Sequence, residues 1–214
     1  MQNQPVSSLI QAVEQASSPL DLLKAVRALA AARHPEAIPT LLEVLGFNNP
    51  GAAVAAVEGL TVLGAEAVPP LLKQLDDHNY GARAWAIRAL ANIGDPRSLA
   101  VLLDAATADF ALSVRRAAAR GLGNLDWSQM AEAEVPAAQA QAVTALLQVT
   151  HDAEWIVRYA AVVGLQSLAQ RLHPAEKEAQ RQRIQQRLAQ LVEADPVASI
   201  QARSQLALSE LGMQ

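Results

Sequence analysis

The 214-residue sequence contains no cysteine. This excludes disulfides, thiolate metal sites and any mechanism in which the chain carries a substrate through a thioether of its own. A chain without disulfides also fits a reducing cytosol. Aromatic residues are scarce as well, since only 3% of the residues are Phe, Trp or Tyr while 51% are hydrophobic. Ala, Leu and Val must therefore form the interior, which favours an all-helical protein.

Neither a basic excess nor a long apolar run is present. The chain has 17 basic and 21 acidic residues, a net charge of −4, which argues against a phosphate backbone as its partner. No segment approaches the roughly 20 apolar residues needed to cross a bilayer, and the start, Met1 to Pro5, lacks the basic-then-apolar plan of a signal peptide. We expect a soluble intracellular protein that neither binds nucleic acid nor inserts into a membrane.

The sequence instead contains a repeat. A helical segment that ends on a leucine recurs at intervals of 30 to 43 residues, with its leucines at Leu29, Leu60, Leu90, Leu122, Leu165 and Leu208. Between these copies lie second apolar segments: Ala37 to Leu45, Ala67 to Leu75, Ser98 to Ala106, Ala138 to Val149 and Ala175 to Val192. Each copy is therefore predicted to be a helix pair, and the array a solenoid.

Charged residues recur within the copies. The aspartates stand 13 residues before their leucines, at Asp77, Asp109, Asp152 and Asp195, and the arginines stand 7 before, at Arg83, Arg115 and Arg158. This pattern resembles the HEAT repeat, which implies an Asp/Arg ladder that links one repeat to the next. Leu22, Ala53 and Gln201 replace the arginine in the terminal repeats. We predict an all-α, right-handed α-solenoid of about five to six HEAT-like helix pairs, a single domain over residues 1–214.

Prolines and glycines support the division into helices. Ser18-Pro19, His34-Pro35, Asn49-Pro50, Asp95-Pro96 and Asp195-Pro196 each place a capping residue before a proline suited to a first helical turn. Gly64 and Gly94 are predicted to end helices. Two stretches lengthen the last repeats, 126–136 and the charged run 176–187, and both are interpreted as surface elaborations, the second as a mostly solvated helix.

Aromatic residues gather at the starts of the helices that end on the repeated leucines. Tyr80 and Trp155 occupy the same repeat position, each three residues before a ladder arginine, which places a ring and a cation on one helix face. These helix starts would form one edge of the solenoid, the aromatic edge, which suits a flat or apolar ligand, or a partner protein. The predicted ligand-binding residues are Tyr80, Arg83, Trp85, Arg115, Trp155, Arg158 and Tyr159. The alternatives are that the arginines form inter-repeat salt bridges and that the rings fill gaps at repeat ends.

No signature of a self-contained active site is evident. His78 and His151 lie at the aromatic edge, whereas His34 and His173 precede prolines and are expected to be cap or turn residues. The histidines and carboxylates show no converging metal-ligand set, and a Gly-x-Ser-x-Gly nucleophile elbow is missing. We therefore expect no metal, and binding rather than chemistry performed by this chain alone.

Asp152 to Leu165 is similar to the HEAT-like phycobilin lyases of cyanobacteria, and most of all to the F-type, or beta, subunits of heterodimeric phycocyanobilin lyases. The resemblance implies a cytoplasmic protein that pairs with an E-type (alpha) subunit. The pair would hold phycocyanobilin as substrate, with no cofactor, and attach it by a thioether to a cysteine of the phycocyanin alpha subunit. Related pairs that also isomerise the bilin carry a His-Cys motif, which this chain lacks, so plain ligation is expected.

The catalytic acid and two other functions stay open. Tyr159 or His78 is a candidate for protonating the bilin during ligation. One alternative is a non-catalytic HEAT scaffold or chaperone in phycobilisome assembly or breakdown. Another is a HEAT-like DNA glycosylase, to whose basic face Arg83, Arg88, Arg115, Arg116 and Arg120 could contribute, although the acidic net charge disfavours it.

Overall fold

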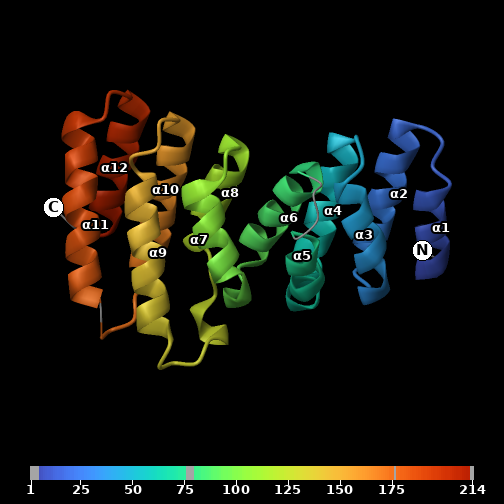
Figure 1. Ribbon diagram of the computed structural model, residues 1–214, viewed down its shortest axis with the longest axis horizontal. Helices are drawn as coiled ribbons and strands as arrows, with labels where there is room; N and C mark the ends of the chain where they lie inside the picture. The colour runs from blue at the N-terminus through green and yellow to red at the C-terminus, as the bar shows by residue number, and fades with distance from the viewer. Residues whose placement is uncertain (1–4, 76–79, 176, 213–214) are drawn as a thin grey trace. The chain divides into compact units, whose positions relative to one another are not determined.

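The structure, a computed structural model, describes residues 5–75, 80–175 and 177–212, and the regular elements in these ranges are all helices. The chain folds into two compact units, an N-terminal unit of Met1–Ile93 and a C-terminal unit of Gly94–Gln214. Figure 1 shows helices joined by short turns in both, which confirms the all-α prediction. That residues 1–214 form a single domain stays a prediction.

The N-terminal unit is a stack of helix pairs. Its elements are α1 (Val6–Glu14), α2 (Pro19–Ala31), η1 (Pro35–Ala37), α3 (Ile38–Leu45), α4 (Pro50–Leu63), η2 (Gly64–Glu66), α5 (Val68–Gln74) and α6 (Tyr80–Ile93), where η denotes a 3-10 helix. Helix α3 packs on α4 and α5 packs on α6, while α2, α4 and α6 stack on one another. The predicted segments 37–45 and 67–75 thus become the second helices of their pairs.

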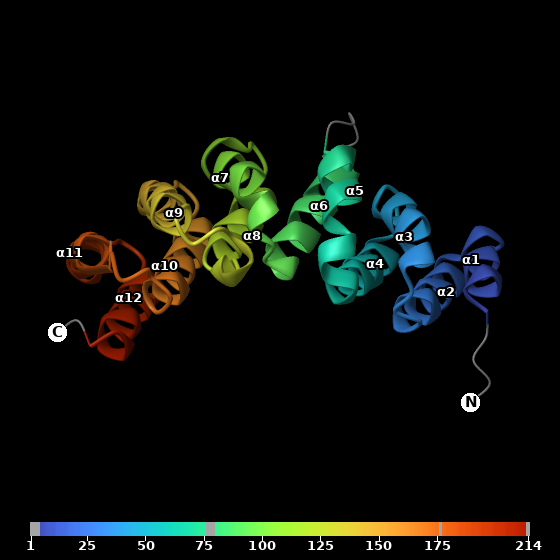
Figure 2. The same ribbon diagram turned by 90° about the horizontal axis from the view of Figure 1, so that it is seen from below.

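The C-terminal unit repeats the same plan in two layers. Its elements are η3 (Pro96–Ser98), α7 (Leu99–Ala108), α8 (Leu112–Leu122), η4 (Trp127–Gln129), α9 (Val135–Val149), α10 (Trp155–Ala169), α11 (Lys177–Ala194) and α12 (Ala198–Glu210). Helices α8, α10 and α12 form one layer and α7, α9 and α11 the other (Figure 2). This stacking of antiparallel pairs confirms the HEAT-type α-solenoid.

Helix ends follow four of the five predicted capping residues, and Asp195 is the exception, because α12 begins at Ala198 with Val197 as its N-cap. Ser18 Oγ accepts a hydrogen bond from the N–H of Asp21 at 3.1 Å, and Asn49 Oδ1 accepts one from Ala52 at 3.0 Å. Histidine performs the same role at His34, whose Nδ1 accepts from Glu36 at 3.3 Å. Gly94 has φ +74°, a left-handed conformation that favours glycine, and it ends α6 as predicted.

The contact between α8 and α10 in the C-terminal unit depends on two glycines. A Cβ on Gly164, in α10, would lie 2.5 Å from the carbonyl oxygen of Ala119 in α8, and one on Gly123 would lie 2.5 Å from Gly164 Cα. Ala118 and Ala160 are buried in the same layer. Small residues on the core face therefore let α8 and α10 approach closely, as their spacing in the sequence predicts.

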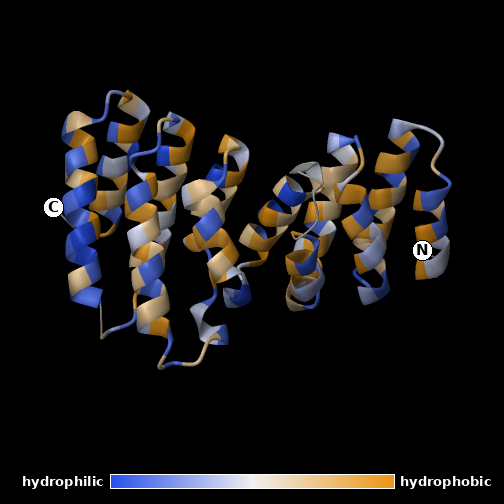
Figure 3. Cartoon of the chain, viewed as in Figure 1, coloured by the Kyte–Doolittle hydropathy of each residue, from blue (hydrophilic) through white to orange (hydrophobic). Residues whose placement is uncertain are grey.

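Two segments interpreted as surface elaborations turn out to be packed. Helix α11 shows mostly hydrophilic residues in Figure 3, yet Ile184, Leu188 and Leu191 are buried against its neighbours. In the 126–136 connector Trp127 is 7% exposed, and the Asp126 N–H donates to the Gly94 carbonyl at 2.7 Å. The prediction of a mostly solvated helix holds for the charged face of α11, whose residues are mainly exposed, while its apolar residues at helical spacing bury one stripe.

Among the described residues, no single helix has the length and apolar composition to cross a bilayer. Two consecutive helices taken together have the required length and apolar composition, namely Pro50–Glu66 and Val68–Gln74, but the chain bends by 119° at the break between them.

Replacing Gly164 by alanine tests the close approach of α8 and α10. The added methyl group must push the helices apart, so Gly164→Ala is expected to lower the free energy of unfolding by about 1–3 kcal/mol. Urea unfolding followed by circular dichroism measures the change. Gly51→Ala in α4 is the control, because a Cβ there meets no atom closer than 3.5 Å, and it should be neutral or stabilise by about 0.4–1 kcal/mol. Equal stability of Gly164→Ala and the original chain would contradict this packing.

Candidate functional site

The arginines and aspartates of the C-terminal unit pair between consecutive helices. Arg115 donates from Nε to Asp152 Oδ2 at 2.7 Å and from Nη2 to Oδ1 at 3.1 Å. Arg158 makes the same two-pronged contact with Asp195, at 2.8 and 3.0 Å. Each arginine reaches 37 residues along the sequence, so the bridges connect one repeat to the next. The ladder interpretation is confirmed for these two positions.

Each ladder arginine also holds its own repeat together. Nη1 of Arg158 donates to the carbonyls of Asp152 and Ala153, at 2.9 and 3.1 Å, across the turn that leads into α10. In the last repeat Gln201, which replaces the arginine, donates to the Asp195 carbonyl at 2.8 Å. A glutamine at this position therefore retains the hydrogen bond within the repeat, but it cannot form the ion pair with a next repeat that an arginine would form.

The aspartates complete the arrangement by ordering the turns that lead into the helices. Oδ1 of Asp152 accepts from the N–H of Glu154 at 2.9 Å, and Oδ1 of Asp195 accepts from Val197 at the same distance. Burial raises the pKa of Asp195, but the hydrogen bonds from Arg158 and Val197 and the Arg158 charge outweigh it, and the pKa lies below its usual range. The pKa of Asp152 is lowered in the same way, with Arg115 as its partner.

The predicted ligand-binding residues fall in both units. In the N-terminal unit, Arg83 and Trp85 lie half-buried on α6. The centroid of the Trp85 ring lies 5.5 Å from the Arg88 guanidinium carbon. This is a cation–π contact, and Arg88 is not one of the predicted ligand-binding residues. Tyr80 is the first residue of α6, and its side chain lies outside the described parts of the structure, as does His78.

In the C-terminal unit the structure brings four of the predicted residues to neighbouring helices. Trp155, Arg158 and Tyr159 lie in the first turns of α10, and Arg115 lies on the adjacent α8. Trp155 is 46% exposed, whereas Arg158 is buried and most of its donors are occupied by the ladder. The rings can accept a ligand at this edge, but the two arginines have structural partners already. Their role in ligand binding stays a prediction.

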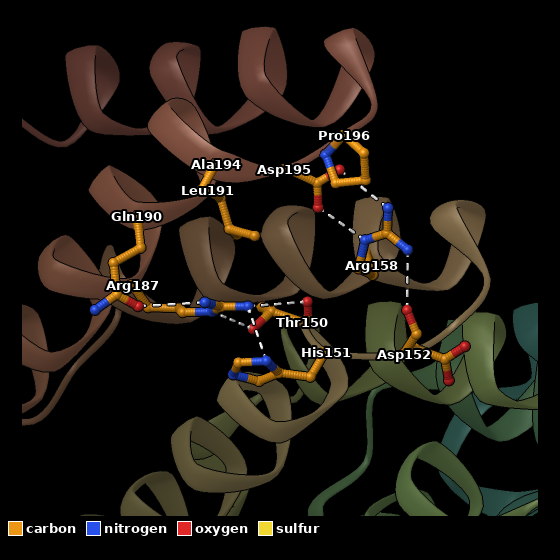
Figure 4. A pocket seen from close by; sticks show the side chains of 10 residues that line it. All are labelled: Thr150, His151, Asp152, Arg158, Arg187, Gln190, Leu191, Ala194, Asp195 and Pro196. Atoms are coloured by element: carbon orange, nitrogen blue, oxygen red, sulfur yellow. Dashed lines mark hydrogen bonds and ion pairs between the residues drawn. The ribbon is translucent and has the colours of Figure 1, made fainter.

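A cleft of about 500 Å³ opens beside the Arg158–Asp195 bridge (Figure 4). The turn between α9 and α10, the last turns of α11 and the turn into α12 surround it. Its lining residues are Thr150, His151, Asp152, Arg158, Arg187, Gln190, Leu191, Ala194, Asp195 and Pro196. Sequence reasoning placed His151 and Arg158 near a site but missed Arg187, which it assigned to a solvated charged run.

Arg187 is the cation at the centre of this cleft. Its Nε donates to Thr150 Oγ1 at 2.7 Å and its Nη2 donates to the Thr150 carbonyl at 3.2 Å. Nη2 also lies 3.2 Å from His151 Nδ1, and Nη1 donates to Gln190 Oε1 at 3.2 Å (Figure 4). Arg187 and Thr150 are 37 residues apart, the spacing of the ladder. That shared spacing is the signal in the sequence that could have identified the arginine.

The electrostatics of the cleft are set by Arg187. Burial lowers the pKa of its guanidinium. The charge of Asp195 opposes this shift in part, and the charge of Arg158 has a smaller lowering effect. Burial and the Arg187 charge lower the pKa of His151. A guanidinium has no acceptor, so the Nδ1 that faces it must be the unprotonated nitrogen and Nε2 carries the hydrogen. His151 is therefore a neutral hydrogen-bond donor at the cleft.

Comparison with known proteins identifies the family. Residues 22–47 match the PBS lyase HEAT-like repeat and residues 48–123 match HEAT repeats. The phycocyanin alpha phycocyanobilin lyase CpcF of Synechocystis sp. is 51% identical over 209 residues, which cover 97% of this chain and 94% of that protein. The chain belongs to the CpcF family of phycocyanobilin lyase beta subunits.

Other members of the CpcF family support the assignment. A phycobilisome maturation protein of Synechococcus elongatus is 51% identical over 94% of this chain and 95% of its own length. The solved complex of CpcE and CpcF of phycocyanin lyase from Nostoc sp. contains a chain that is 49% identical and superposes with a TM-score of 0.74. That match covers 81% of this chain and 99% of the solved one. The resemblance stated from the sequence is confirmed.

Asp195→Asn tests the buried ladder pair. Folding lowers the pKa of Asp195 below the value of about 3.9 for an unfolded aspartate. Its contribution to stability is therefore fully present above that value and is lost as the pH falls through the folded pKa. We expect Asp195→Asn to lower the free energy of unfolding by about 3 kcal/mol at neutral pH, because Arg158 keeps a buried, uncompensated charge. The variant should also lose less stability than the original chain between about pH 5 and about pH 2.

Urea unfolding at a series of pH values measures both effects. Asp104→Asn is the matched control, since Asp104 is exposed on α7, and it should alter neither the stability nor its dependence on pH. An unchanged pH dependence in Asp195→Asn would mean that the ladder carboxylate does not contribute through its charge.

Proposed function

We propose that this chain is the F-type subunit of a heterodimeric lyase that attaches phycocyanobilin to the phycocyanin alpha subunit. The observation that carries the proposal is the 51% identity to the Synechocystis CpcF over nearly the whole chain. The CpcF of Nostoc sp. was solved in complex with CpcE, which supports an E-type subunit as the partner of this chain. The cyanobacterial cytoplasm is the proposed compartment, and phycocyanobilin is a substrate rather than a resident cofactor.

The nucleophile in this reaction comes from the acceptor, because this chain has no cysteine. The acceptor thiol adds across the ethylidene double bond of the bilin. Its sulfur bonds to the ethylidene carbon, the carbon–carbon double bond becomes single, and the adjacent ring carbon takes up one proton from the donor while the thiol releases one. The addition needs no oxidant or reductant. The lyase therefore contributes by holding the two reactants in register and by supplying the proton. Tyr159, half-buried on α10, is the proposed donor among the described residues.

Binding energies favour a site completed by the partner subunit. Two charge-assisted contacts give roughly 1.5–3 kcal/mol each and two ring contacts roughly 0.5–1.5 each, a gross sum of about 4–9 kcal/mol. Association costs about 4 kcal/mol or more, while micromolar binding requires about 8 kcal/mol net. The contacts that one chain can offer fall short of that value. A composite pocket formed with the E-type subunit follows from this difference.

The alternative function is a scaffold or chaperone that binds phycobilisome proteins without turning over bilin. It is retained because one relative is named a phycobilisome maturation protein. Co-expression of this chain with an E-type subunit, phycocyanobilin and the phycocyanin alpha subunit separates the two functions. Zinc-induced fluorescence on a denaturing gel reports covalent attachment. Attachment that requires both chains supports the lyase, and none with a folded pair supports the scaffold.

Trp155→Ala tests the aromatic edge in the same assay. Because Trp155 is 46% exposed, its loss should leave the helical spectrum unchanged and reduce the rate of transfer by about 2- to 10-fold, the value of one ring contact. Leu206→Ala is the control, since Leu206 is 49% exposed on α12 and lies away from the helix starts. Equal transfer by both variants would remove Trp155 from the binding site.

A further inference from the structure

The arginines around the cleft differ in how their charge is balanced. Arg115 and Arg158 each face a carboxylate at 2.7–2.8 Å. Arg187 and Arg183 do not: within the described ranges, no carboxylate oxygen lies at ion-pair distance from either, and their recorded hydrogen-bond acceptors are neutral. The two arginines are one helical turn apart on α11, where like charges repel each other. An anion placed beside them would relieve that repulsion.

Arg187 is also held ready for such an anion. Hydrogen bonds to Thr150 and His151 fix its Nε and Nη2. Among the described residues Nη1 donates to the side chain of Gln190, which is exposed, at 3.2 Å. A carboxylate oxygen can take the place of that amide oxygen and form a stronger, charge-assisted bond. The guanidinium loses little conformational freedom when this happens, because it is already fixed.

The surroundings indicate what kind of molecule carries the carboxylate. A second hollow of about 360 Å³ adjoins the cleft and is lined by Leu147, Gln148, His151, Arg183, Gln186, Arg187 and Gln190. The two hollows share His151, Arg187 and Gln190, so they lie side by side around these three side chains. Leu147, which is half-buried, provides apolar surface beside the cations, and the buried Leu191 lies beneath the cleft. This combination suits a carboxylate on a short arm of a larger apolar body.

We propose that Arg187 and Arg183, with His151 as a neutral donor, hold the propionate carboxylates of the bilin. The inference rests on the proposed function, which supplies a ligand with two such arms. It reassigns the anion-binding role from Arg115 and Arg158, whose charges are neutralised within the ladder, to two arginines of α11 outside the repeat pattern. An Asp or Glu side chain of the partner subunit is the other source of a carboxylate.

The test compares phycocyanobilin with its dimethyl ester, in which both carboxylates are masked. The purified lyase pair is titrated with each pigment in the absence of acceptor, and noncovalent binding is followed by visible absorbance. The original pair should bind the free acid at least about 10-fold more tightly than the ester, as expected for a charge-assisted contact. Arg187→Gln should lose most of this preference, and Arg183→Gln a smaller part.

Two further variants guard against a loss of folding. Arg187→Lys retains the charge and should keep part of the preference. Lys177→Gln removes a positive charge from the same helix, about 15 Å from Arg187, and should keep the whole preference for the free acid. Equal affinity of the original pair for acid and ester, or an undiminished preference in Arg187→Gln, would overturn the inference while leaving the lyase function intact.

The remaining outcomes also decide the matter. An Arg187→Gln chain that no longer associates with the E-type subunit, together with equal binding of acid and ester by the original pair, would place a partner carboxylate in the cleft, against the proposal. An original pair that binds neither pigment would overturn the proposed function itself, and the inference with it.

Discussion

The bidentate contact between Arg158 and Asp195 is the interaction on which the C-terminal unit depends. The Arg158 guanidinium holds the turn before its own helix through the carbonyls of Asp152 and Ala153, and it pairs with the carboxylate of the next repeat. That carboxylate accepts from the Val197 N–H and so orders the turn that leads into α12. A buried ion pair adds little net stability over an apolar pair, because desolvation offsets its attraction. Its contribution here is geometric, since it fixes α10 against α12 and thereby positions the turn that carries Thr150 and His151.

Much of this fold could be predicted because its determinants are local and repeated. The six-residue interval between aspartate and arginine places both residues at one helix start, and its recurrence reveals which helices stack. Capping residues such as Asn49 act within three residues of themselves, so the sequence displays them directly. The buried stripe of helix α11 was harder to predict for a different reason. Ile184, Leu188 and Leu191 stand among charged residues and glutamines, so the segment has the pattern of a polar helix although it packs on α12, α10 and α9.

The candidate site was harder to predict, because an arginine's function depends on whether a carboxylate already faces it. Repetition is itself informative on this point. Arg115 and Arg158 recur with an aspartate at a fixed spacing, so the partner comes with the pattern. Arg187 has the same 37-residue reach but meets the hydroxyl and carbonyl of Thr150. In a repeat protein, a cation that breaks the charge pattern is therefore a better candidate for ligand binding than one that follows it.

A carboxylate site on α11 also fits the energetics of a transfer reaction. The propionates of a bilin do not change when the thioether forms, so contacts to them stabilise substrate, transition state and product alike. Such uniform binding orients the pigment without accelerating the chemistry. The acceleration must arise near the ethylidene carbon, from alignment of the acceptor sulfur and delivery of a proton. Since uniform contacts also retain the product, moderate affinity at the propionates favours turnover, and a site divided between two subunits can release the pigment once the acceptor holds it covalently.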